Sequence, residues 1–380
     1  MSSAPADALA PIAPERQVYD ASQWKLMRIA FFKHRLAVAG AAIVALGYFT
    51  LAFAEFLAPY DPTRGAYVSP MQSNQLIPPR LPRILSPEGV LTWPYVHPLV
   101  EARDPVTLRV TYEEDRSVSY PIRLFVHGEP YKMWGLFWSD VHLWGVDGDT
   151  RLNLLGTDQK ARDVFSRVLW GTRISLSIGL LGVLVTFFLA IILGTVSGYY
   201  SGAVDTLIQR VIEVIVSVPT LPLWMVLTVA IPLNWPLERV FFAITLILAL
   251  LSWPGLARTV RGKVLALREA DYAIAAQLDN GSTSRVMFAH VIPGVMSHLI
   301  ASLTLSIPGM ILGETALSFL GLGLHEPVIS WGVMLQDAQQ LRTILFAPWL
   351  LWPVAAVVFF ILAFNFMGDG LRDAADPYKS

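Results

Sequence analysis

The sequence contains no cysteine and few charged residues. The lack of cysteine excludes disulfide bonds and thiolate metal ligands, although it does not fix the compartment. Charged residues make up 15% of the 380 residues and hydrophobic residues 54%, and the mean hydropathy is +0.52. This balance favours apolar membrane spans joined by modest polar loops over a soluble domain. The sequence therefore indicates an integral membrane protein.

Motifs that hold phosphate or carry catalysis are also missing. No stretch matches the phosphate-binding loop G-x-x-x-x-G-K-[ST], the dinucleotide turn G-x-G-x-x-G, the zinc helix H-E-x-x-H or the nucleophile elbow G-x-S-x-G. The seven histidines are scattered, and His325 beside Glu326 is expected in a polar loop rather than a metal site. A net charge of −1 leaves no basic face for nucleic acid. We expect no catalytic residue, cofactor or metal on this chain.

Six apolar runs approach or exceed the length of about 20 residues that a helix needs to cross a bilayer core. They cover residues 36–56, 174–196, 207–231, 240–256, 296–320 and 346–366. Basic residues before the first run place the amino terminus in the cytoplasm, and six spans return the carboxyl terminus there. The length of the first run favours an uncleaved anchor over a cleaved signal peptide.

These runs divide the chain into four parts. Residues 1–35 are predicted as a cytoplasmic tail, of which 1–24 make no core. Residues 36–56 are predicted as the first transmembrane helix, 57–155 as an external insert and 156–380 as a five-helix core domain. In the insert, 106–112 alternates, 113–116 resembles a turn and 118–126 is β-prone, which predicts a small antiparallel sheet. Its aromatic residues favour a small core with an interfacial belt, and a ligand-stacking platform is the less favoured alternative.

A polar segment, 259–293, separates the fourth and fifth runs. Its apolar residues recur at helical intervals over 262–278, which predicts an amphipathic helix outside the hydrocarbon. Residues 279–282 then break this helix, and 282–291 begin a second one. The basic residues of this region favour a cytoplasmic position. We expect a helix-turn-helix protrusion between two spans.

A few polar residues and prolines fall near or inside the predicted spans. Arg210 and Glu213, three residues apart, are expected to form an intrahelical ion pair. Glu314 is a candidate for a cavity or permease interface, where Gly309 and Gly313 would let helices of two subunits approach closely, although packing is favoured over ligand contact. Pro219, Pro222, Pro254 and Pro308 are expected to kink spans three to five.

Several blocks of residues together carry a resemblance to a known family. They are Leu155-Gly156-Thr157-Asp158 with Arg162-Asp163, Ser166-Arg167, Gly171 and Arg173-Ile174-Ser175-Leu176; residues 205–219; Ser252-Trp253-Pro254-Gly255 with Arg258; residues 314–323; Ser330-Trp331-Gly332; and Gly368-Asp369-Gly370-Leu371-Arg372-Asp373. Ala161 stands where a glycine is usual. From residue 36 onward, except for the insert, the chain resembles the C-type permease subunit of the oligopeptide/dipeptide/nickel family of ATP-binding-cassette (ABC) importers.

The resemblance implies an all-α, six-helix permease of the type I importer kind in the bacterial inner membrane, with the β-containing insert on the periplasmic side. It also implies that 259–293 is the coupling loop that docks on an ATPase subunit. Ala275, Ala276 and Pro293 match the family pattern, whereas Ile274 replaces a glutamate and Asn280 a glycine. Asn280 and the adjacent Gly281 both tolerate the left-handed turn.

The implied partners are a homologous B-type permease, two ABC ATPase subunits that hold ATP and Mg, a periplasmic solute-binding protein and the lipid bilayer. The implied cargo is an oligopeptide or a similar small solute, and an oligosaccharide is the main alternative. A proton-driven secondary carrier would need ionisable residues at mid-span and inverted repeats, and neither is evident. A non-transporting membrane scaffold would bind no ATPase.

Overall fold

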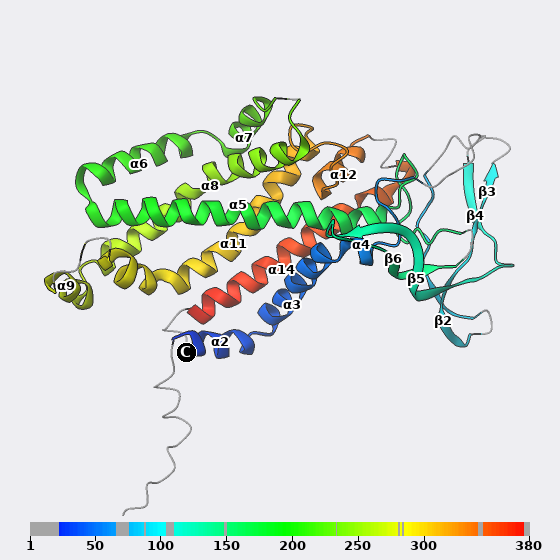
Figure 1. Ribbon diagram of the computed structural model, residues 1–380, viewed down its shortest axis with the longest axis horizontal. Coiled ribbons are helices and arrows are strands. Elements are labelled where there is room, and N and C mark those ends of the chain that lie inside the picture. The colour runs from blue at the N-terminus through cyan, green and yellow to red at the C-terminus, as the bar shows by residue number, and fades with distance from the viewer. Residues whose placement is uncertain are drawn as a thin grey trace, which may run out of the picture.

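The computed structural model describes residues 23–65, 76–86, 89–103, 110–147, 150–232, 234–279, 282, 285–340 and 345–375. Long helices form an elongated bundle, and a β-rich insert lies at one end of it (Figure 1). The helices are α2 (Gln23–Lys33), α3 (Arg35–Ala52), α4 (Ala54–Leu57), α5 (Val164–Tyr200), α6 (Gly202–Ser217), α7 (Thr220–Val229), α8 (Leu237–Leu267), α9 (Asp271–Leu278), the π-helix η1 (Val286–Val291), α11 (Ile292–Phe319), α12 (Trp331–Asp337), the 3-10 helix η2 (Pro348–Leu351) and α14 (Trp352–Ala375).

Within the described ranges, five helical stretches are long and apolar enough to cross a membrane. They are α3, α5, α8, the part of α11 from Leu299 to Phe319, and η2 with α14. The pair α6 and α7 passes the same test only when taken together, and it is bent by 87°. The predicted third span, 207–231, is therefore not one straight helix. Pro219 stands at the break, immediately before α7, where its ring prevents the preceding residue from continuing the helix.

Helix α5 runs through the middle of the bundle and packs closely on α8. It begins where the Asp163 carboxylate accepts a hydrogen bond from Ser166 N–H at 2.7 Å, which satisfies one of the free donors at the helix start. Small residues bring the two backbones together, because a Cβ on Gly194 would lie 2.6 Å from the Ala257 carbonyl oxygen. Helices α3 and α14 meet in the same way, since a Cβ on Gly40 would lie 2.5 Å from the Ala363 oxygen.

The described part of the amino-terminal region begins at residue 23, so the prediction that residues 1–24 make no core falls almost wholly outside it. Residues 1–22 lie outside the described ranges. Residues 23–33 form α2, in which Met27 is buried. The predicted first transmembrane helix, 36–56, is interrupted at Phe53, between α3 and α4.

The insert contains two antiparallel sheets, which confirms the predicted kind of pairing. Strands β1 (Arg83–Leu85), β2 (Leu91–Val96), β5 (Tyr120–Met133) and β6 (Phe137–Val146) form one sheet in the order β1-β2-β5-β6, and β3 (Leu99–Arg103) pairs with β4 (Val110–Glu114). The predicted turn at 113–116 is wrong at its first two residues, because strand β4 continues to Glu114. The β-prone stretches also do not pair with each other, since β4 pairs with β3 and β5 pairs with β2 and β6.

The chain enters and leaves the insert at one place. Thr157 N–H donates to the Ile77 carbonyl at 2.9 Å, and Arg80 N–H donates to the Asn153 carbonyl at 3.1 Å. The Arg80 guanidinium also donates to the Arg151 carbonyl at 2.7 Å. The insert therefore joins the helical part through a narrow, hydrogen-bonded neck, as inserted domains commonly do.

The β5–β6 hairpin is attached to the end of the first span by three ring N–H groups. Trp134 donates to the Ala52 carbonyl, Trp144 to the Leu57 carbonyl, and His142 contacts the Ala58 carbonyl. Carbonyls at the end of a helix have no partner within the helix. The insert supplies these partners, which holds the hairpin against the end of α3 and α4.

Candidate functional site

The two features singled out by the sequence lie at opposite ends of the bundle. Helix α9, which belongs to the 259–293 segment, is at one end, and strands β1 to β6 are at the other (Figure 1). Two regions are candidates for function: the turn and helix around α9, and the junction where α4, α5 and the insert meet.

The 259–293 segment does not contain the continuous helix predicted over 262–278. Helix α8 ends at Leu267, and α9 begins at Asp271. The break falls at Ala270, whose backbone is extended. Just before it, the Arg268 guanidinium donates to the carbonyls of Gly198 at 3.1 Å and Tyr199 at 3.2 Å. These are among the last carbonyls of α5, which have no helical partner, and a cation is favoured at this negative end. The chain turns at Arg268 to cap α5.

A second contact ties the neighbouring helices together. Arg261 of α8 and Asp205 of α6 form a two-pronged ion pair, with Nε–Oδ1 and Nη2–Oδ2 both at 2.6 Å. The same carboxylate accepts a hydrogen bond from Ser197 of α5. Paired geometry of this kind is stronger and more directional than a single ion contact. Helices α5, α6 and α8 are therefore linked at the end that carries α9.

Helix α9 has one face packed on the protein and one face free. Ala273 is fully buried, and Ala276 is partly buried against the same cluster, which includes Val264 and Val291. Ala275 is exposed beside Ile274, and Leu278 has 81% of its surface accessible. Of the two alanines singled out by the sequence, Ala275 points outward and Ala276 inward.

The remaining coupling residues are placed as follows. Asn280 and Gly281 lie outside the described residues. The predicted second helix over 282–291 is the π-helix η1, which continues directly into α11. Pro293 is exposed in the first turn of α11, where a missing N–H leaves no bond unmade. The second half of the segment is thus the start of a predicted span.

Glu314 lies in the interior of this chain. Its Oε1 accepts hydrogen bonds from Ser330 at 2.7 Å and Ser318 at 2.9 Å, and Ser175 lies 3.4 Å from Oε2. A Cβ on Gly313 would lie 3.0 Å from the side chains of Leu248 and Trp224. Gly309 is exposed, with open space beside it. The three residues therefore have different surroundings: Glu314 and Gly313 pack inside the subunit, and Gly309 faces outward.

An ionic cluster that the sequence did not indicate lies at the start of α5. It consists of Asp158, Arg162, Arg167, Glu326 and Asp337. Arg162 is 2.7 Å from Asp158 and 2.6 Å from Glu326. Burial acts to raise the pKa of Glu326, but hydrogen bonds from Lys160 and Arg162 outweigh it and hold that pKa at about 2. The cluster joins the 155–176 block to the loop after α11, where the sequence predicted only a polar loop.

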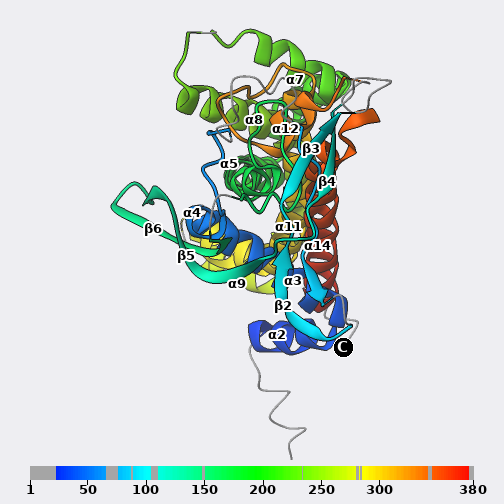
Figure 2. The same ribbon diagram turned by 90° about the vertical axis from the view of Figure 1, so that its right-hand side faces the viewer.

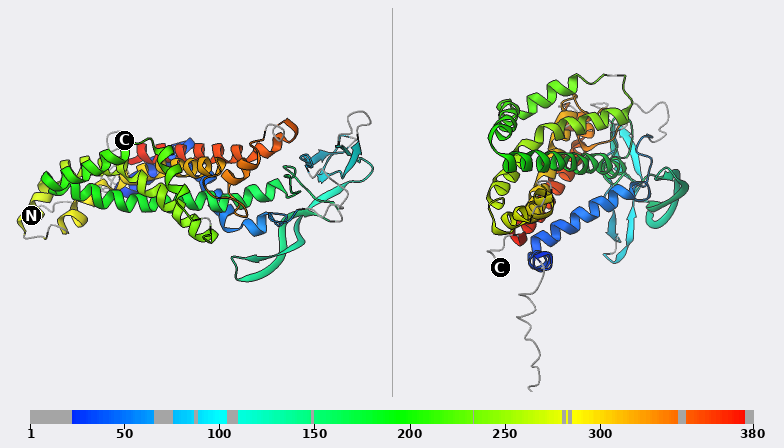
Figure 3. Two further views of the ribbon diagram at one scale, coloured as in Figure 1. Left: turned by 90° about the horizontal axis from the view of Figure 1, so that it is seen from above. Right: turned by 60° about the vertical axis from the view of Figure 1, so that its left-hand side comes forward.

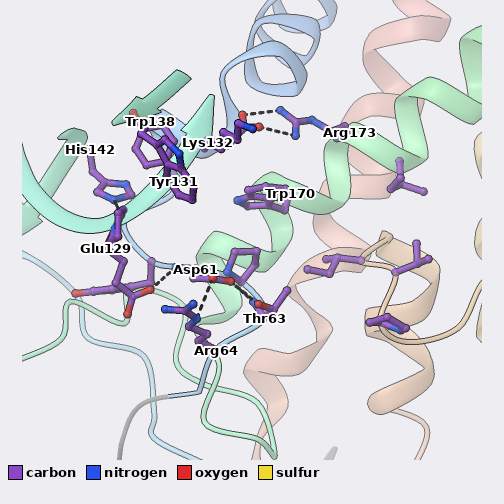
Figure 4. A pocket seen from close by; sticks show the side chains of 18 residues that line it. Asp61, Thr63, Arg64, Glu129, Tyr131, Lys132, Trp138, His142, Trp170 and Arg173 are labelled. Carbon is purple, nitrogen blue, oxygen red and sulfur yellow. Dashed lines mark hydrogen bonds and ion pairs between the residues drawn. The ribbon is translucent and has the colours of Figure 1, made fainter. Parts of the chain in front are cut away.

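A cavity of about 580 Å³ lies between the insert and the helices, lined by α4, α5, β5, β6 and the 327–329 loop. Figure 4 shows Trp138, Tyr131 and His142 on one side and Trp170 and Arg173 on the other. Three of the charged groups in its lining, Glu55, Arg173 and Glu129, have partners within the chain. Glu55 and Arg173 form a two-pronged pair at 2.8 and 2.6 Å, and Glu129 accepts from Asp61 N–H and from Arg151. The first pair joins α4 to α5, and the Glu129 bonds join β5 to the segments that precede and follow the strands of the insert.

These observations define a polytopic membrane subunit with a protruding helix at one end and an added β domain at the other. Among the described residues, no group of three or more candidate ligand side chains could hold a metal ion. The family described as "binding-protein-dependent transport system inner membrane component" matches residues 159–379, and the "N-terminal TM domain of oligopeptide transport permease C" matches residues 22–79. The chain belongs to this family of transport permeases.

Curated relatives agree with this assignment. The dipeptide transport system permease protein DppC of Bacillus subtilis is 38% identical over 224 residues, which cover 58% of this chain and 68% of the relative. The oligopeptide permease OppC of Escherichia coli K12 is 40% identical, covering 58% and 71%. The glutathione permease GsiD of Pectobacterium atrosepticum is 38% identical, covering 61% and 74%.

The chain is therefore the transmembrane permease subunit of an ATP-driven, binding-protein-dependent importer in a bacterial inner membrane. It is a transport subunit rather than an enzyme, and ATP hydrolysis belongs to partner ATPase subunits. Residues 80–158, which contain the strands of the insert, lie between the two family matches.

Proposed function

We propose that this subunit forms half of a translocation path for short peptides. The observation that carries the proposal is the similarity to three permeases whose names specify dipeptide, oligopeptide and glutathione, all of which contain amide-linked amino acids. A homologous B-type permease would supply the other half of the path. Two ABC ATPases and a periplasmic solute-binding protein would complete the importer.

In this proposal the bundle crosses the membrane six times, and the bent α6–α7 pair is the third span. Both termini and the 259–293 segment lie in the cytoplasm, and the insert lies in the periplasm. The basic residues near α9 support this orientation through the positive-inside rule. The position of α9 and the insert at opposite ends of the bundle agrees with it.

The outer face of α9 is proposed to dock on an ATPase subunit. Ala275 is small enough for a partner to approach closely, and the exposed side chains of Ile274 and Leu278 provide apolar contact on either side. A displacement of α9 would be transmitted to α5 through the hydrogen bonds of Arg268, and to α6 through α8 and the Arg261–Asp205 ion pair. ATP-driven movement of the two ATPases would then turn these helices between inward and outward access.

The three candidate interface residues receive different roles. Gly309 is proposed to face the second permease or lipid, since nothing in this chain fills the space beside it. Glu314 and Gly313 are proposed to hold α11 against its neighbours. Replacement of Glu314 would therefore impair assembly rather than cargo choice.

Transport of defined cargo tests the proposed function. The complete importer, reconstituted in proteoliposomes with its binding protein, is expected to accumulate short peptides in an ATP-dependent manner. Uptake of oligosaccharides without uptake of peptides would favour the alternative cargo. Peptide uptake driven by a proton gradient without ATP would contradict the assignment of an ABC importer.

A further inference from the structure

The tip of the β5–β6 hairpin, residues 134–138, exposes four large apolar side chains. The accessible fractions are 51% for Trp134, 75% for Leu136, 52% for Phe137 and 72% for Trp138. Single exposed apolar residues are common on protein surfaces, but a continuous group of this kind marks a contact with a partner or a membrane. Trp138 also lines the cavity between the insert and the helices, whereas Trp134, Leu136 and Phe137 belong to no site described above.

The tip is joined to the exposed surface of the first span. A line of aromatic rings runs from Phe49 to Phe53 at 4.7 Å, from Phe53 to Trp134 at 5.5 Å and from Trp134 to Phe137 at 6.1 Å. Phe49 is 48% exposed on α3, and only 22% of this candidate span is buried within the protein. The apolar surface of a membrane-crossing helix therefore continues without a break onto the hairpin.

The turn is built to hold Trp134 at this place. Trp134 has a φ of 49°, in the left-handed region that bulky residues seldom adopt, and Gly135 follows with a φ of 72°. The Trp134 indole N–H donates to the Ala52 carbonyl at 2.6 Å, which fixes the ring against the end of α3. A strained backbone held by a specific side-chain bond points to a function for the position.

The β5–β6 hairpin also extends to the depth at which the first span ends. Seen along the long axis of the bundle, it reaches sideways past α4 instead of pointing away from the helices (Figure 2). In the left view of Figure 3 its teal tip lies level with the blue end of the first span, whereas the other strands of the insert lie beyond it. The tip is thus beside the helices at the depth where the span ends.

We propose that residues 134–138 anchor the insert in the outer head-group region of the lipid bilayer. Tryptophan concentrates at this depth, because its ring takes apolar contacts while the indole N–H keeps a polar partner. Leu136 and Phe137 add apolar surface beside the two tryptophans. The backbone is suited to the interface, since Met133 and Phe137 pair across the hairpin and the Leu136 N–H donates to the Met133 carbonyl. The anchor would fix the angle of the insert to the membrane, whatever cargo the importer carries.

Lipid-dependent quenching tests this proposal in the assembled importer. Leu136→Cys and, in a second protein, Phe137→Cys are labelled with an environment-sensitive fluorophore. This chain has no native cysteine, and the partner subunits are used in cysteine-free form. The complex is placed in nanodiscs of phosphatidylethanolamine and phosphatidylglycerol that carry a nitroxide near the head group. Ser117→Cys, in the exposed turn before β5, is the matched control outside the tip.

Several-fold stronger nitroxide quenching at Leu136→Cys and Phe137→Cys than at Ser117→Cys is expected. Adding Leu136→Asp to the Phe137→Cys protein is expected to reduce that quenching several-fold, because a carboxylate resists transfer from water. Equal quenching at the tip and at Ser117→Cys would overturn the proposal. A tip shielded from both the lipid nitroxide and aqueous iodide would also overturn it, and would indicate that another subunit covers the hairpin.

Discussion

Glu326 shows how one side chain can connect distant parts of this permease. Its carboxylate lies 2.6 Å from Arg162 and 3.5 Å from Arg167, both near the start of α5, although more than 150 positions separate them in the chain. Arg167 is 1% exposed. Loss of a carboxylate partner leaves such a buried cation with fewer hydrogen bonds, which costs about 1–3 kcal/mol.

Replacing Glu326 with glutamine is expected to lower the midpoint of thermal unfolding in detergent at pH 7 by several degrees. Glu113→Gln, on the exposed face of β4, is the matched control and is expected to have little effect. Because the pKa of Glu326 falls in the folded protein from 4.5 to about 2, its contribution is present above pH 4.5 and is lost as the pH falls toward 2.

The difference in unfolding midpoint between wild type and Glu326→Gln should therefore remain constant from pH 7 to pH 4.5 and shrink below pH 4.5. The pKa of Asp163 shifts in the opposite direction to that of Glu326, because burial raises it to about 6. This group is present in both proteins, so its effect cancels from the difference. An unchanged midpoint at pH 7 would contradict a stabilising role for the cluster.

Contacts between residues close in the sequence were predictable, and contacts between residues far apart in the sequence were not. The Arg210–Glu213 pair is confirmed at 2.6 Å, because a spacing of three on a helix fixes the geometry. Arg268 looked like one more basic residue of an amphipathic helix. Its partners are carbonyls about 70 positions earlier, at the end of α5, and no local pattern indicates them.

Among the elements, the β insert is the part most easily tested by removal. Arg80 and Asn153 are hydrogen-bonded at the neck, so the two ends of the insert lie together. Replacing residues 82–149 with a short Gly/Ser linker is expected to leave the helical bundle intact and assembled. We predict weaker delivery from the solute-binding protein, because an external domain at the end of the bundle is placed to meet it.

The measurement is peptide transport over a range of binding-protein concentrations. A higher concentration for half-maximal uptake is expected for the deletion, with little change in the maximal rate. A linker variant that transports like wild type at limiting binding protein would show that the insert has no role in delivery. The family matches, which end at residue 79 and resume at 159, make assembly of this variant a reasonable expectation.

Element types followed from the sequence more reliably than element ends. Long apolar runs specify helices, but α5 extends ten residues before the predicted start at 174, because a polar first turn capped by Asp163 carries no apolar signal. The bend between α6 and α7 falls at Pro219, where a kink was predicted, although the sequence did not indicate its size of 87°. The sequence did not indicate which strands pair, because alternation indicates which face is buried, not which strand lies beside it.

In the proposed topology of the whole molecule, the insert and α9 lie in different compartments. Ser117→Cys and Ser282→Cys, made singly in this cysteine-free chain, allow a direct check. Ser117→Cys is expected to react with a membrane-impermeant thiol reagent applied outside spheroplasts, and Ser282→Cys only after the membrane is opened. The reverse pattern would invert the topology.

The overall orientation, which stays a prediction, was open to inference from the sequence, since charge and span number act over the whole chain. The division of α9 into a packed face and a free face was not. Ala275 and Ala276 are adjacent and chemically identical, and only the contact of Ala276 with the cluster around Val264 separates them.

The central claim is that the outer face of α9 transmits ATP-driven movement to the bundle, and Ala275→Arg tests it most directly. The exposed position should accept arginine without loss of folding, whereas a docked partner would meet a bulky charge. Ser117→Arg, which adds the same charge at an exposed position of the insert, is the control and should be tolerated. In proteoliposomes, Ala275→Arg is expected at normal level but without transport or substrate-stimulated ATP hydrolysis. Normal coupled transport by Ala275→Arg would contradict the claim.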